Sequence, residues 1–105
     1  MQFNNPYWSV KQKVNTLQRY ILVHSYLYYT ANTNIISDKQ WDVSAKQLVG
    51  LQQELGSLKQ TDYGYVFKGF DGTTGFDLYD RLSKEDKVKI KRISMSVYRT
   101  YRMTI

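Results

Sequence analysis

Two carboxylates and several aromatic rings are grouped in one short stretch of the chain, and together these residue types can bind a flat cation. Tyr28 and Tyr29 are followed, after a short polar turn, by Asp38. Trp41 and Asp42 come next on the same side of that turn. Aromatic faces attract cations, and ionised carboxylates accept hydrogen bonds from hydroxyl groups. The group therefore predicts a site for a planar, positively charged ligand that carries hydroxyl groups.

Two helices joined by a turn must position these residues. Ser37 and the Gln three residues later form a capping-box pattern, which predicts a helix over about 38–55. Asp38 and Asp42 are four residues apart, so they share one face of this helix and point back toward its start. That face can meet the end of a preceding helix, where Tyr28 lies.

The order and spacing of residues over about 17–54 resemble those of a known family. The motif reads H-S-Y-L-Y-Y, a short turn, I-S-D, two further residues, an aromatic residue and Asp, and then a leucine-rich helix. It resembles the N-terminal helical domain of bacterial NAD-dependent DNA ligases, which binds the nicotinamide mononucleotide half of NAD. The resemblance implies NAD or nicotinamide mononucleotide as the ligand.

The resemblance also implies which residues contact that ligand. The positions that match the family's nucleotide site are Tyr28, Tyr29, Asp38, Trp41 and Asp42. In the family, the residue that corresponds to Tyr28 gives an aromatic face to nicotinamide. Trp41 stands where the family usually has Tyr, which keeps an aromatic face but loses a hydroxyl group. Asn34 stands where the family usually has a Pro in the turn.

The catalytic motif of a ligase is not matched. The family's nucleotidyltransferase motif is Lys, any residue, Asp, Gly, whereas this chain reads Lys68-Gly69-Phe70-Asp71-Gly72, which is one residue longer. On a strand, a slip of one residue turns a side chain to the opposite face. A chain of 105 residues is also too short for the nucleotidyltransferase fold and the DNA-binding modules. We therefore expect a non-enzymatic protein without complete ligase activity.

Composition narrows the class of protein. The length of 105 residues predicts one domain. The absence of cysteine and the presence of a single histidine, His24, exclude disulfides, thiolate chemistry and a histidine metal cluster. We expect His24 to be a hydrogen-bonded core residue. No secretory signal is evident and no apolar run approaches the ~20 residues of a membrane span, so we expect a cytoplasmic protein without membrane association.

The net charge of +6 is concentrated at the end of the chain. Residues 1–80 carry equal numbers of basic and acidic side chains, so the excess lies in 81–105. Ser83 as an N-cap predicts a helix over about 84–101. Its basic side chains favour an anionic partner such as nucleic acid, although a solvated face that maintains solubility explains them equally well. The candidate anion-binding residues are Lys87, Lys91, Arg92, Arg99 and Arg102.

The first helix has a start signal of its own. Asn5 is a favoured N-cap and Pro6 is favoured at the first helical position. Apolar residues then recur at helical spacing, and the run 20–23 is apolar nearly all round. We therefore predict a helix over about 6–29 that is buried on several sides near its centre.

The connection over about 57–81 is rich in aromatic and turn-forming residues. It predicts either a small β-hairpin or an aromatic loop that packs over the helices. We expect Tyr65 and Phe67 to be buried. We expect Phe70 and Phe76 to lie nearer the surface, where exposed rings usually mark a protein interface.

The predicted fold class is therefore mainly α, with a helical hairpin, an aromatic connection and a basic C-terminal helix. The leading functional hypothesis is a stand-alone module that binds a nicotinamide nucleotide or uses that surface to engage a protein. An alternative is an inhibitor or modulator of the kind that bacteriophages encode. Such a protein would bind a host enzyme or defence complex through the aromatic loop or the basic helix. A third hypothesis is a nonspecific nucleic-acid binder.

Overall fold

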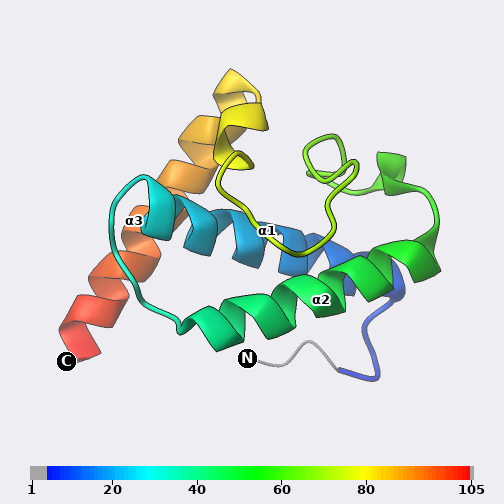
Figure 1. The fold of residues 1–105 in the computed structure, drawn as a ribbon, viewed down its shortest axis with the longest axis horizontal. Coiled ribbons are helices and arrows are strands. Elements are labelled where there is room, and N and C mark those ends of the chain that lie inside the picture. Colours follow the sequence, from blue (N-terminus) through cyan, green and yellow to red (C-terminus); the bar gives the residue numbers. More distant parts are fainter. Residues whose placement is uncertain (1–4, 105) are drawn as a thin grey trace.

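A computed structural model describes residues 5–104, which form three α-helices and two short 3₁₀ helices (Figure 1). The elements in chain order are α1 (Val10–Tyr29), α2 (Asp38–Leu55), η1 (Leu58–Gln60), η2 (Tyr79–Arg81) and α3 (Lys84–Thr104). No strand is present within the described part of the chain. The predicted mainly α fold class is therefore confirmed, and the connection between α2 and α3 is a loop rather than a β-hairpin.

Side-chain caps fix where α2 and α3 begin. The hydroxyl of Ser37 accepts a hydrogen bond from the N–H of Gln40 at 3.0 Å, and the Gln40 side chain accepts the N–H of Ser37 at 2.9 Å. This is the predicted capping box. At the start of α3, Ser83 Oγ accepts the N–H of Asp86 at 3.1 Å. The helix α3 therefore begins as predicted, but it continues past the predicted end at Tyr101 to reach Thr104.

The helix α1 begins later than predicted, at Val10 rather than at Pro6. A second capping box explains the difference, because Ser9 Oγ accepts the N–H of Gln12 at 3.2 Å and the Gln12 side chain accepts the N–H of Ser9 at 2.7 Å. The side chain and carbonyl of Asn5 instead close a turn just before this box. A reciprocal cap satisfies two free N–H groups, whereas a single Asn cap satisfies fewer.

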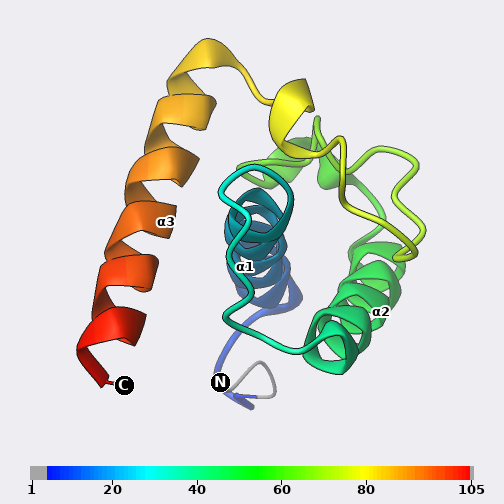
Figure 2. The same ribbon diagram turned by 60° about the vertical axis from the view of Figure 1, so that its left-hand side comes forward.

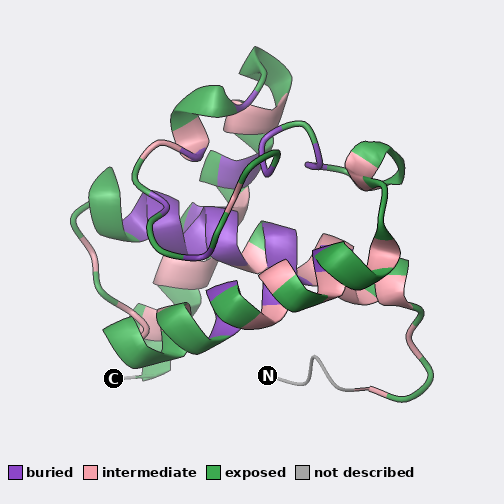
Figure 3. Ribbon diagram, turned by 45° about the vertical axis from the view of Figure 1, so that its right-hand side comes forward, coloured by how far each residue is buried: buried purple, intermediate pink, exposed green. Residues whose placement is uncertain are grey.

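The helix α1 is the centre of the fold. It pairs with the antiparallel α2 on one side and contacts α3 on the other, so that α1 lies between them (Figure 2). The connection 56–83 runs over the open face of the α1–α2 pair (Figure 1). This arrangement explains why buried residues gather along α1 and beneath the connection (Figure 3).

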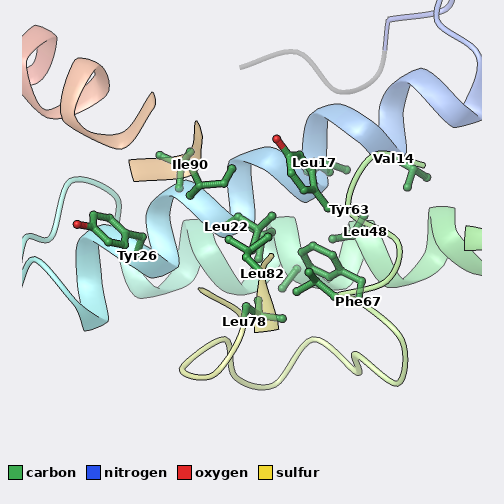
Figure 4. Close-up of a cluster of buried hydrophobic side chains, with 14 of the residues drawn as sticks. Val14, Leu17, Leu22, Tyr26, Leu48, Tyr63, Phe67, Leu78, Leu82 and Ile90 are labelled. Carbon is green, nitrogen blue, oxygen red and sulfur yellow. The ribbon is translucent and has the colours of Figure 1, made fainter. Parts of the chain in front are cut away.

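The hydrophobic core forms where the connection crosses the helix pair. Ile21 and Leu22, in the predicted apolar run of α1, are fully buried. Phe67, Leu78 and Leu82 of the connection point toward α1 and α2 in the same cluster (Figure 4). Among the buried hydrophobic residues of the described chain, the connection supplies five, which are Tyr63, Val66, Phe67, Leu78 and Leu82, whereas α3 supplies Ile90.

A buried polar network attaches the connection to the helices. Gln18 of α1 is fully buried. Its side-chain amide donates to Gln52 Oε1 at 3.0 Å and to Thr61 Oγ1 at 3.2 Å, and its carbonyl oxygen accepts the N–H of Tyr63 at 3.4 Å. Because a buried amide without partners would cost free energy, this network fixes the chain direction after α2.

The prediction that Tyr65 is buried is wrong, whereas the prediction for Phe67 is confirmed. Tyr65 is 52% exposed and Phe67 is 1% exposed. This segment is a series of turns and does not alternate like a strand, so Tyr63 is buried in place of Tyr65. The hydroxyl of Tyr65 donates to Asp86 Oδ2 at 2.6 Å and accepts the N–H of Ser83 at 2.9 Å. Tyr65 therefore ties the connection to the start of α3.

None of the helices within residues 5–104 combines the length and the apolar character that a membrane crossing requires.

The core position of Phe67 gives a stability prediction. Replacing Phe67 with Ala leaves a cavity among fully buried side chains, and we expect the free energy of unfolding to fall by about 3–5 kcal/mol. The matched control is Phe76→Ala, because Phe76 is 64% exposed and its truncation should change stability by less than about 0.5 kcal/mol. Urea denaturation followed by circular dichroism measures both. Equal losses in the two variants would contradict this packing.

Candidate functional site

A cavity of about 410 Å³ lies where the end of α1, the following turn and the start of α2 meet. The structure brings all five residues of the predicted site together on its wall. They are Tyr28, Tyr29, Asp38, Trp41 and Asp42. The turn residues 33–37 complete one side, and His24 and Thr73 were not predicted to line it.

The turn after α1 folds back over the helix end and so creates one wall of the cavity. The N–H of Thr33 donates to the carbonyl of Leu27 at 2.7 Å, and the N–H of Ala31 donates to the carbonyl of Tyr26 at 3.1 Å. Asn32 adopts a left-handed conformation with φ of 52°, which Asn tolerates better than most residues. Local hydrogen bonds therefore hold this turn in place of the proline that the ligase family usually carries there.

Two tyrosine rings stand beside the cavity with much of their surface free. Tyr28 is 46% exposed and Tyr29 is 48% exposed. Their ring centroids are 4.8 Å apart and the rings meet edge to face. The pair is thus held in a favourable mutual geometry, while part of each ring remains available to a ligand.

Trp41 forms the inner aromatic wall. Its indole N–H donates to Ser25 Oγ at 3.1 Å, and its ring meets Phe70 edge to face at a centroid distance of 6.5 Å. The single polar group of Trp41 is therefore used inside the protein. The Trp41 side chain has no second polar group, so it does not replace the hydroxyl of the Tyr that the family usually has.

The two carboxylates lie on the exposed first turns of α2, as predicted from their spacing. Asp42 forms an ion pair with Lys46, with 2.8 Å between the carboxylate oxygen and Nζ. Both side chains are more than half exposed, and such pairs contribute at most about 1 kcal/mol. A cationic ligand can therefore compete with Lys46 for Asp42 at little cost.

A loop of the connection reaches the cavity, where Thr73 is part of the lining. Asp71 accepts hydrogen bonds from the N–H and the hydroxyl of Thr73, at 3.0 and 2.7 Å. These bonds hold the pKa of the Asp71 carboxyl below its ordinary value. At Gly75 the chain passes so close to α1 and α2 that a Cβ atom would lie 2.6 Å from Ser25 Oγ and 2.9 Å from Trp41.

The sequence predicts a turn in this loop but does not predict that Thr73 lines the cavity. The signal was the Asp-Gly-Thr-Thr-Gly run, which predicts a turn. Such a run does not indicate which surface the turn will cover, because that depends on the packing of Phe67 and Leu78 on either side of it.

His24 lies at the floor of the cavity and is only 7% exposed. The ring of Tyr20 packs against it at a centroid distance of 4.5 Å. Its predicted burial is confirmed, but its Nδ1 atom has no hydrogen-bond partner among the described residues, contrary to the expectation of a fully bonded core histidine. Burial lowers the pKa of His24 to about 4, so the ring is neutral at neutral pH.

The predicted basic residues lie on α3, away from the cavity lining. Most of them line shallow grooves on the outer face of that helix, namely Lys91, Arg92, Arg99 and Arg102. Lys87 differs from the others because it is half-buried and its Nζ lies 5.9 Å from the ring centroid of Tyr79. The structure therefore separates Lys87 from the remaining candidate anion-binding residues.

The two aromatic residues predicted to contact a protein have different environments. Phe70 is half-buried, and its ring meets Phe67 edge to face at 5.1 Å. Phe76 is 64% exposed. Of the two, Phe76 therefore presents the larger free surface.

Within residues 5–104, no group of acidic or histidine side chains is arranged to hold a metal ion.

The chain is thus a small helical domain with an aromatic and acidic cavity beside two capped helices. Comparison with known proteins places this chain beside DNA ligases. The DNA ligase of Lawsonia intracellularis (strain PHE/MN1-00) is 38% identical over 64 residues, which are 56% of this chain and 9% of the ligase. The DNA ligase of Fervidobacterium nodosum (strain ATCC 35602 / DSM 5306 / Rt17-B1) is 32% identical over 68 residues, or 59% of this chain and 10% of the ligase.

The similarity covers a segment and not a whole ligase, because the chain spans about a tenth of the length of these curated relatives. No protein-family model and no solved structure matches the chain. The predicted resemblance to DNA ligase is confirmed, and the three-helix structure fits a helical domain of such an enzyme.

The close approach at Gly75 gives a prediction about the cavity wall. In Gly75→Ala the added methyl group would collide with Ser25 and Trp41, and we expect a loss of about 1–3 kcal/mol in the free energy of unfolding. The matched control is Gly50→Ala within α2, where no heavy atom lies within 4 Å of the new Cβ apart from the adjacent residues and the local helix backbone. That change should stabilise the protein by about 1 kcal/mol. Thermal denaturation of both variants tests the contact, and stabilisation by Gly75→Ala would refute it.

The burial of His24 gives a prediction about pH. Because its pKa is about 4 in the folded state and 6.5 ordinarily, the unfolded chain binds a proton in this interval that the folded chain does not. Stability should therefore fall as the pH drops from 7 toward 4, with about 2 kcal/mol lost between pH 7 and pH 5. Denaturant titrations at several pH values measure this loss. His24→Gln should remove most of it, and an unchanged pH dependence in that variant would contradict the assignment.

Proposed function

We propose that this chain is a non-catalytic, ligase-like module that binds a nicotinamide nucleotide in the cavity between α1 and α2. The observation that carries the proposal is the convergence of five residues, matched to the nucleotide site of the ligase family, on one cavity. These residues come from two helices separated by a turn, so their convergence is a property of the fold. The similarity to DNA ligases supports the same conclusion.

The chemistry of the cavity suits the nicotinamide mononucleotide part of NAD. Its nicotinamide ring is flat and carries a positive charge, so it can stack on the faces of Trp41 and Tyr28. The ribose hydroxyl groups can donate hydrogen bonds to the carboxylates of Asp38 and Asp42. The neutral His24 at the floor adds no repulsion toward the cationic ring. The cavity thus combines attraction for the charge with acceptors for the hydroxyl groups.

A second candidate function is the engagement of a protein through the rim of the same cavity. Phe76 is 64% exposed and directly follows Gly75, which contacts the cavity wall. An exposed ring of this size is typical of a contact residue in an interface. A partner that binds here would cover the cavity, so nucleotide and protein would compete.

Nucleotide binding can be tested through Trp41. In a Trp8→Phe background Trp41 is the only tryptophan, and a stacked nicotinamide ring should quench its fluorescence. Nicotinamide mononucleotide and NAD should both quench and should both raise the melting temperature, with about 2.7 kcal/mol of stabilisation at a hundred times the dissociation constant. AMP, which lacks the nicotinamide ring, should do neither.

A variant of a cavity carboxylate and a charge-matched variant outside the cavity test which residues bind the nucleotide. Asp42→Ala should weaken nicotinamide mononucleotide binding by about tenfold or more, because it removes an ionised hydrogen-bond acceptor. Its ion pair with Lys46 is exposed, so the fold should keep its stability. Glu54→Ala removes the same charge at the far, exposed end of α2 and should leave binding unchanged. The proposal is wrong if millimolar nicotinamide mononucleotide neither quenches Trp41 nor shifts the melting temperature.

A further inference from the structure

The helix α3 has an apolar ridge on the face that points away from α1. Ile90 and Ser94 are fully buried and mark the face that packs on the rest of the protein. On the opposite face, Val88 is 54%, Met95 is 52% and Met103 is 82% exposed. These three side chains are spaced by seven and eight residues, which places them in line along one side of the helix.

Two shallow grooves follow this ridge and adjoin one another. One contains Val88 and the other contains Met103. Both are lined by Met95 and Arg99, so they share a wall at the middle of the helix. The outer face of α3 is therefore a continuous, partly apolar surface along most of the helix.

The charged side chains that line these two grooves are all positively charged. The grooves are lined by four basic side chains and by no acidic one among the described residues. The basic residues are Lys91, Arg92, Arg99 and Arg102. Arg102 also lies over the ring of Tyr98 at 5.8 Å, which extends the apolar floor beneath the charge. An occupant must therefore supply negative charge along its flanks as well as apolar side chains.

We propose that the outer face of α3 docks an acidic amphipathic helix of a partner protein. Val88, Met95 and Met103 recur at intervals of seven and eight residues, which matches one of the two apolar positions of a helix–helix seam. The basic side chains of Arg92 and Arg99 lie beside them on the same face. A partner helix with Leu in the seam and Glu on both flanks would cover Met95 and pair with Arg92 and Arg99. This proposal does not depend on nucleotide binding, because the surface shares no residue with the cavity lining.

Three other occupants fit the surface less well. A second copy of the chain would bring the same basic face, and like charges would oppose each other. Nucleic acid satisfies the basic residues but makes no use of an apolar ridge. A membrane surface favours a broad apolar face with the charges at its edges, whereas here Arg99 lies between Met95 and Met103 on the ridge itself.

The direct test uses a designed helical peptide as the probe. The peptide has the 21-residue length of α3, with Leu at the seam positions and Glu at the flanking positions, and carries a fluorophore for anisotropy measurements. We expect it to bind the full chain with a dissociation constant that rises with salt. The double change Met95→Ser/Met103→Ser should weaken binding about tenfold or more, since apolar contact and not only charge holds the peptide.

Matched controls separate the possible causes. Arg92→Gln/Arg99→Gln should weaken binding and flatten its salt dependence, whereas Lys11→Gln/Lys59→Gln removes the same charge from exposed positions on other elements and should have no effect. A control peptide with Gln in place of its seam Leu should bind at least about tenfold less tightly. Equal binding of the two peptides would overturn the proposal. So would tighter binding of the chain to a short DNA duplex or to anionic lipid vesicles than to the acidic peptide.

Discussion

The hydrogen bond between Trp41 and Ser25 is the contact on which the rest of the site depends. It joins the start of α2 to the end of α1 at 3.1 Å, and Trp41 also lines the cavity. The connection then passes over both residues at Gly75, where there is no room for a side chain. The contact between the two helices and the close passage of the loop thus meet at the same two residues beside the cavity.

The core that stabilises the molecule and the surfaces proposed to bind partners lie in different parts of the fold. The centre of α1 is surrounded by apolar side chains and by the satisfied amide of Gln18. The cavity residues Tyr28 and Tyr29 lie at the edge of this core and are nearly half exposed, and the carboxylates of α2 are exposed as well. Changes in these side chains can therefore alter recognition without removing the contacts that hold the helices together.

Much of the helical framework was already determined by local sequence. The capping box at Ser37 fixed the start of α2, because a side chain three residues away satisfies the free N–H groups of the first turn. The spacing of Asp38 and Asp42 placed both on one face for the same local reason. Local signals also compete, and the box at Ser9 prevailed over Asn5 and Pro6 at the start of α1.

Sequence by itself thus determined the fold class, the helix pair and the five residues of the candidate site. Only the tertiary structure decided what the connection covers, because the path of a turn-rich segment depends on which side chains the core accepts. Phe67 fills the core, whereas Tyr65 stays outside with its hydroxyl bonded to the start of α3. The same long-range packing brought Thr73 to the cavity and left Met95 exposed on α3, and no spacing along the chain encodes such contacts.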